Sequence, residues 1–170
     1  AKTAQRKGLS HLMQQAAQAA KENQLGETGR QQAQSSDILE EMLAQMNQSD
    51  KHRREILRRK LEQLAQAVEQ LVKRQEAQLS RIHEVKNIVS LDMPMAALRR
   101  NTLSVEDEAR QSRKTQTVAD ELGGAVKQQA GAISALRSDD REVSWENENA
   151  SLTHLRAALE LVRKMRSAAQ

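Results

Sequence analysis

Residues 61–74 read LEQLAQAVEQLVKR, in which Leu-Glu-Gln-Leu-Ala returns seven residues later as Val-Glu-Gln-Leu-Val. Apolar side chains that recur at spacings of three and four residues form a continuous seam along one face of an α-helix. A seven-residue repeat keeps that seam in contact with a neighbouring helix. This stretch therefore predicts a long helix that packs against other helices.

The composition agrees with a helical protein. The 170 residues include 6 Gly, 1 Pro and one Trp, but no Phe and no Tyr. Strands are rich in β-branched and aromatic residues, and the turns between them need Gly, Pro and Asn. A chain with so few of these residues cannot supply the turns of a β or α/β fold, and we expect an all-α protein.

Interruptions of the helical pattern divide the chain into four predicted helices. Gly26 and Gly29 favour a C-cap and a turn, because glycine tolerates the left-handed conformation that ends many helices. The segment 90–94 is the strongest break, since it ends in the only proline. The segment 138–140 is polar and suits a tight connection. The predicted helices cover about residues 3–24, 37–89, 93–137 and 142–168, with a hairpin tip at 90–94.

The second and third predicted helices carry seams that align when the chain folds back near Pro94. Leu61 then faces Leu122, and the other seam residues pair in the same register. We therefore expect a long antiparallel coiled-coil hairpin, flanked at its base by the first and last helices in an up-down-up-down four-helix bundle. The chain would form a single elongated helical domain, 1–170.

The middle of the predicted seam is polar, because Gln75, Gln78, Thr102, Ser112 and Gln116 occupy seam positions. Each of them forgoes roughly 1.5–3 kcal/mol relative to a buried Leu. Polar residues in a seam can also fix the register of the helices. We expect this part of the hairpin to be weakly packed.

Small residues are concentrated between 123 and 135, where Gly123, Gly124 and Gly131 interrupt the third predicted helix. A glycine inside a helix costs about 1 kcal/mol relative to Ala. The three glycines indicate either a local break or the close approach of another helix, and we favour close approach. The last predicted helix has a seam of its own, at Trp145, Glu148, Leu152, Leu155, Leu159 and Val162, in which Trp145 would anchor the bundle.

The hairpin tip gathers apolar side chains. If they are exposed, they would form a partner-binding surface in which methionines make adaptable contacts. If they pack on one another, they simply close the hairpin, which is the alternative that we favour. These residues are Ile88, Leu91, Met93, Met95 and Leu98.

Residues 51–60 hold six Lys and Arg side chains against one Glu. On a helix, Lys51, Arg54 and Arg58 share a face that could contact phosphates or anionic lipid headgroups. No aromatic side chain accompanies the run to stack on nucleic-acid bases. We therefore favour a solvated helix face and regard nucleic acid as an unlikely partner.

No motif in the sequence predicts catalysis or a bound cofactor. His11, His52, His83 and His154 lie far apart, and none is preceded by a Glu three residues earlier or followed by a second His one turn on, as helical metal sites require. The chain has no cysteine, which excludes disulfides and thiolate ligands. We expect a protein that is not an enzyme, with no cofactor and no metal.

These features favour a non-catalytic helical scaffold, spacer or protein–protein interaction module that acts through helix faces or the hairpin tip. Its partner would be another protein chain or a second copy of itself, and in the second case the protein would be a homo-oligomer. The alternative function is binding to nucleic acid or an anionic surface through residues 51–60. No run reaches the roughly 18–20 apolar residues of a membrane span.

The segments QQAAQAA at 14–20 and LAQA at 64–67 resemble helical regions of large bacterial envelope proteins in their composition. The resemblance implies a soluble segment of such a protein and says nothing about its sites. Because the sequence starts with Ala1 rather than Met, a processed protein or a segment of a longer chain is expected. The compartment stays open.

Overall fold

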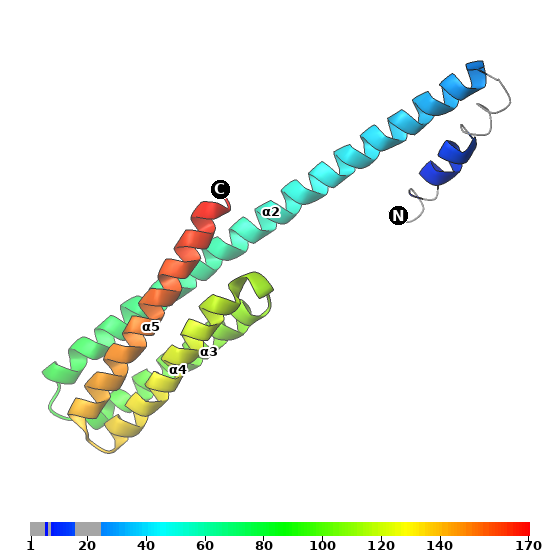
Figure 1. Cartoon of the computed structure of the whole chain (residues 1–170). Helices are drawn as coiled ribbons and strands as arrows, with labels where there is room; N and C mark the ends of the chain where they lie inside the picture. Colours follow the sequence, from blue (N-terminus) through cyan, green and yellow to red (C-terminus); the bar gives the residue numbers. More distant parts are fainter. Residues whose placement is uncertain (1–5, 7, 16–24) are drawn as a thin grey trace. The chain divides into compact units, whose positions relative to one another are not determined.

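A computed structural model describes residues 6, 8–15 and 25–170, and its regular elements within these ranges are all helical (Figure 1). The prediction of an all-α protein is therefore confirmed. Of the predicted helix at 3–24, residues 6 and 8–15 are helical and the rest lies outside the described residues. The other elements are α2 (Leu25–Glu84), η1 (Ile88–Leu91), α3 (Asp92–Arg110), η2 (Arg113–Thr115), α4 (Gln116–Arg137) and α5 (Arg141–Ala168).

Contacts between Cα atoms divide the chain into two compact units, Ala1–Glu55 and Ile56–Gln170. The first unit contains the helical residues 8–15 and the N-terminal part of α2. The second contains the C-terminal part of α2 and all of α3, α4 and α5.

The helix α2 begins at Leu25, so the predicted turn around Gly26 and Gly29 and the predicted start near Asp37 are wrong. No glycine among the described residues has a positive φ. A Cβ added at Gly29 would meet nothing within 4 Å, so no close contact requires glycine there either. Each helical glycine costs only about 1 kcal/mol relative to Ala, and such a weak local preference does not end this helix.

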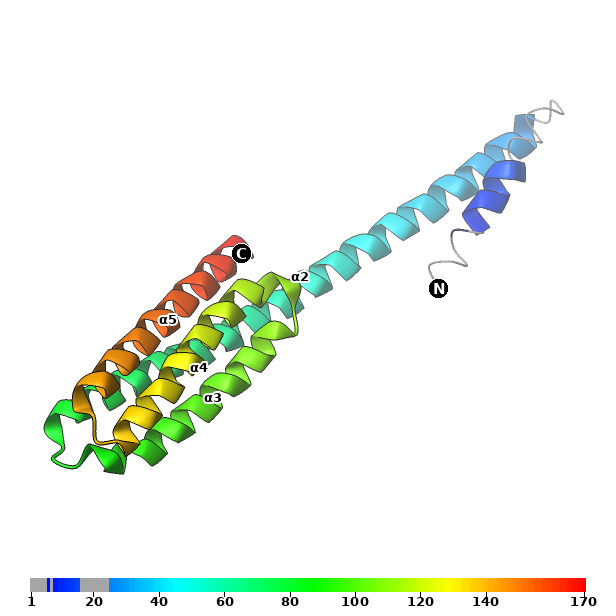
Figure 2. The ribbon, with the colours of Figure 1, turned by 60° about the horizontal axis from the view of Figure 1, so that its bottom comes forward.

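The second unit is a four-helix bundle. Figures 1 and 2 show α3, α4, α5 and the C-terminal part of α2 lying side by side, each antiparallel to the helix before it. The predicted up-down-up-down order is present, but its four helices all come from the unit Ile56–Gln170, whereas the prediction counted residues 3–24, of the other unit, among them. The core is aliphatic and includes Val68, Leu71, Leu98, Leu122, Leu136, Leu155 and Val162.

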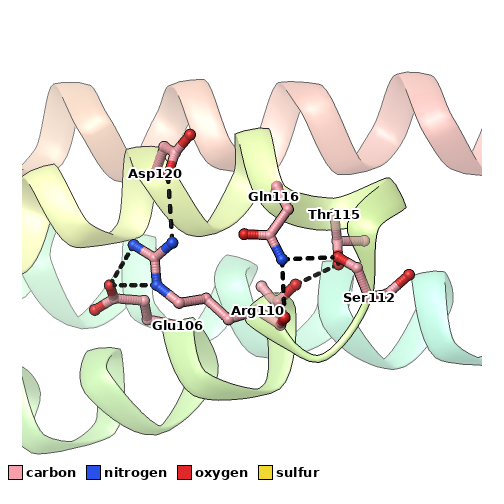
Figure 3. Close-up of polar contacts among 7 residues, drawn as sticks. Glu106, Arg110, Ser112, Thr115, Gln116 and Asp120 are labelled. Atoms are coloured by element: carbon pink, nitrogen blue, oxygen red, sulfur yellow. Dashed lines mark hydrogen bonds and ion pairs between the residues drawn. The ribbon is translucent and has the colours of Figure 1, made fainter.

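The predicted third helix, 93–137, is wrong as a continuous element, because it breaks between α3 and α4 (Figure 3). Side chains bind the backbone groups that the break leaves open. Gln116 Nε2 donates to the carbonyls of Arg110 at 2.8 Å and Ser112 at 3.1 Å, and Thr115 Oγ1 donates to the carbonyl of Ala109. Ser112 Oγ accepts from the amide of Lys114 at 3.3 Å. Serine and threonine can compete with helical hydrogen bonds in this way.

An ion-pair cluster spans the same break (Figure 3). Arg110 Nη2 lies 2.8 Å from Glu106 Oε1 on α3, and Arg110 Nη1 lies 3.3 Å from Asp120 Oδ1 on α4. The hydrogen bond to Glu106 raises the pKa of Arg110 above its ordinary value. The cluster joins α3 and α4 on either side of the break. The predicted third helix is therefore two helices, and the predicted hairpin of two helices is replaced by the three helices α2, α3 and α4.

The predicted close approach at the glycines is confirmed. A Cβ at Gly124 would lie 2.7 Å from His154 Cε1 on α5, and one at Gly131 would lie 3.1 Å from Asn147 Cγ. The ring of His154 is also held by Glu121 of α4, with Nδ1 and Oε2 2.8 Å apart. The helix α4 continues through these glycines because α5 packs where their side chains would be.

The turn between α2 and α3 also differs from the predicted fold-back. α2 ends at Glu84 rather than near Val89, and η1 precedes α3. Gln75 Nε2 consequently lies 3.9 Å from Met95 Sδ, whereas a fold-back near Pro94 would have placed Met95 opposite the residues just before the tip. The earlier end of α2 shifts the pairing of the two helices along their length.

The side chain of Arg141, at the start of α5, binds three carbonyls at and just beyond the C-terminal end of α2. Its Nη1 donates to the carbonyl of Ile82, and its Nη2 donates to those of Val85 at 2.9 Å and Lys86 at 3.2 Å. The last carbonyls of a helix have no partners within the helix. Arg141 therefore satisfies the end of α2 and fastens α5 to it.

Arg141→Ala should lower the free energy of unfolding of the second unit by about 1–3 kcal/mol, because it leaves these carbonyls without their charged donor. Urea unfolding followed by far-UV circular dichroism measures the change. Arg156→Ala is the matched control, since it removes an exposed ion pair with Glu76 (3.2 Å) and should cost less than about 1 kcal/mol. Equal losses for the two variants would contradict the capping role of Arg141.

Candidate functional site

A polar cluster lies in the interior of the four-helix bundle. Each of the four helices contributes at least one residue, and every side chain in the cluster is at most 1% exposed. Buried polar groups are costly unless they are hydrogen-bonded to one another. The members of the central polar cluster are Gln75, Thr102, Gln129, Ser144, Glu148 and Ser151.

Gln75 of α2 is the hub of this cluster. Its Oε1 accepts hydrogen bonds from Ser151 Oγ at 2.8 Å and from Gln129 Nε2 at 3.4 Å. Its Nε2 donates to Glu148 Oε1 at 3.3 Å. Gln129 Nε2 also donates to Thr102 Oγ1 at 3.0 Å. One side chain of α2 is thus linked directly to α4 and α5, and to α3 both through Gln129 and through its contact with Met95 Sδ.

Glu148 is the ionisable member of the central polar cluster. Burial raises the pKa of its carboxyl group to about 7, from an ordinary value of 4.5. Hydrogen bonds donated by Ser144 Oγ, at 3.2 Å, and by Gln75 act in the opposite direction but do not offset the burial. The carboxyl group therefore changes charge near neutral pH inside the bundle.

The cluster favours one register of the helices. Sliding α2 by a turn would separate Gln75 from Glu148 and Ser151, and a buried polar group without a partner costs about 1–3 kcal/mol. The native register already leaves Gln129 Oε1 without a hydrogen-bond partner in the described part of the chain. Because all six side chains are buried, they hold helices together and face no substrate.

The predicted tip residues are divided by the fold. Ile88, Leu91, Met95 and Leu98 are 0–4% exposed and belong to the bundle core, whereas Met93 is 76% exposed. The apolar tip therefore packs into the bundle, and it does not present these four side chains to a partner.

The predicted basic residues are exposed. Lys51, Arg54 and Arg58 all lie on α2 with exposed side chains. Lys51 and Arg54 belong to the first unit and Arg58 to the second. Trp145, which was expected to anchor the bundle, is 38% exposed, and its ring centroid lies 6.3 Å from that of His83.

An exposed apolar surface lies in the first unit. Leu39, Leu43 and Met46 of α2 are 44%, 58% and 53% exposed, and their spacing of four and three residues puts them on one side of the helix. We call these three residues the apolar face of α2. Their spacing is visible in the sequence, but the predicted seam was centred on residues 61–74 and these three residues were missed.

Sequence reasoning found part of the central polar cluster. Gln75, Thr102 and Glu148 were assigned to helix seams, where the structure buries them. Gln129, Ser144 and Ser151 were missed. Glutamine and serine at single helical positions carry no signal for burial until the neighbouring helices are known, and the break before α4 had not been recognised.

Within the described residues, none of the helices has both the length and the apolar character of a membrane span. Among the same residues, no three His, Asp or Glu side chains gather in a group that could hold a metal ion. Comparison of the chain with protein-family models, curated proteins and solved structures finds no match.

The raised pKa of Glu148 predicts a pH-dependent stability. Between about pH 4.5 and 7 the folded chain keeps a proton that the unfolded chain releases, so this group stabilises the fold at low pH. That contribution, about 3 kcal/mol, is lost as the pH rises through 7. Glu148→Gln mimics the protonated carboxyl group and should exceed the wild type in stability at pH 8, but not at pH 5.

Urea unfolding at a series of pH values checks this prediction through the difference between the variant and the wild type. Glu160→Gln is the control, because Glu160 lies on the same helix with a side chain 69% exposed; this variant should not reproduce the gain in stability at pH 8. A pH-independent difference for Glu148→Gln would show that the buried carboxyl group does not titrate near 7.

Proposed function

We propose that this chain is a non-catalytic helical scaffold or protein–protein interaction module that binds its partner through the apolar face of α2. The exposure of Leu39, Leu43 and Met46 on successive turns of one helix supports the proposal. Covering such side chains is favourable by roughly 25 cal/mol per Å² of apolar surface. Contiguous exposed apolar side chains on a helix are typical of interaction sites.

The other surfaces give less support to this function. The hairpin tip keeps only Met93 exposed among its predicted contact residues. The central polar cluster is closed inside the bundle, where it supports a scaffold and offers no contact surface. A helix face, rather than the tip, is therefore the interaction surface in this proposal.

A photo-reactive benzophenone amino acid at Leu43, incorporated in cells that make the protein, tests the proposal. It should give a discrete cross-linked species, because the benzophenone then lies inside the partner interface. The same amino acid at Gln48, an exposed position on the opposite side of α2, is the control and should give much less product. The absence of a discrete species at Leu43, or equal products at the two positions, would refute the proposal.

The alternative function, binding to nucleic acid or an anionic surface, draws support from the exposure of Lys51, Arg54 and Arg58. If it holds, affinity for a DNA duplex or for phosphatidylserine vesicles should fall steeply as salt rises, because binding releases counterions. Replacing the three residues by Gln should reduce both the affinity and its salt dependence. Unchanged binding in this triple variant would exclude the alternative at this face.

A further inference from the structure

We infer that the partner covering the apolar face of α2 is a second copy of this chain, bound antiparallel through the segment from Asp37 to Arg54. The inference rests on the proposed function and names its partner. It is carried by the position of the apolar face within an acidic part of α2 that is followed directly by a basic part of the same helix.

The charges of α2 change sign along the first unit. Residues 37–50 contain two Asp and two Glu but no Lys or Arg, whereas residues 51–54 read Lys-His-Arg-Arg. The side chains of both parts are exposed at most positions, including Glu40, Lys51 and Arg54. A single helix therefore carries an acidic part and a basic part. The acidic part of one copy is complementary in charge to the basic part of a second copy.

Helical spacing sets the register of this pairing. Glu40 and Arg54 lie seven residues before and after Asn47 and border the apolar face on the same side. A two-fold axis at Asn47 would place Glu40 of each copy opposite Arg54 of the other. Met46 lies one residue from this axis and Leu43 four residues, so the Met46 side chains of the two copies would meet at its centre with one Leu43 on either side.

The alternatives to this arrangement are less favourable. Within one chain, Glu40 and Arg54 are fourteen residues apart on α2, about 21 Å at 1.5 Å per residue, and cannot pair with each other. Parallel pairing would bring the acidic parts of two copies together and the basic parts together. Like charges beside a helix seam disfavour that orientation.

Charge reversal tests the inference in the full chain. Sedimentation equilibrium at low salt should show a dimer, and Glu40→Arg or Arg54→Glu should each weaken dimerisation on the order of tenfold, since each creates repulsion at two symmetric contacts. The double variant should restore the association of the wild type. Glu41→Arg, the same charge change on the opposite side of α2, is the control and should leave it unchanged.

Restoration by the double variant supports antiparallel self-pairing, because the two positions cannot touch within one chain. A monomer at every concentration overturns the inference, and so does a dimer that the single reversals weaken but the double variant does not restore. A cross-link from Leu43 to a different protein would overturn the inference while leaving the proposed function intact. Failure of the proposed function would instead remove the cross-link itself.

Discussion

The burial of one carboxyl group and five amide or hydroxyl side chains at the centre of an aliphatic bundle constrains the rest of the second unit. Glu148 can be buried there only because Gln75 and Ser144 donate to it. Gln75 can be buried only because Ser151 and Gln129 donate to its other end. The aliphatic side chains around them would tolerate several registers, since hydrophobic contacts are not directional. The polar contacts are directional, and they select one register for all four helices.

In the connections of the bundle, side chains form hydrogen bonds with backbone groups that have no partner within a helix. Gln116 and Thr115 bind open carbonyls at the end of α3, and Arg141 binds carbonyls at and just beyond the end of α2. Helices can therefore end here without glycine or a positive φ. The single positive φ of a non-glycine residue in the described part of the chain belongs to Asp139, between α4 and α5.

The interior of the bundle and the exposed side of α2 have different roles in the proposed function. The central polar cluster is buried, and its hydrogen bonds fix the register of the helices. The apolar face of α2 lies in the other unit, on a helix whose charges change sign near residue 50. Stability and interaction are thus assigned to separate surfaces, so a substitution at Leu43 should affect association with little effect on the bundle core.

The sequence by itself determined the all-α class, the helical seam around residues 61–74 and the close approach of a helix at Gly124, because periodicity and residue size act locally. It located the last helix within one residue of its observed start at Arg141. Only the tertiary structure decided that the chain breaks at residues 111–115, since Ser112, Thr115 and Gln116 end a helix only where their side chains find free carbonyls. It also decided which polar seam residues meet in the central polar cluster, because those contacts depend on a register that no single helix contains.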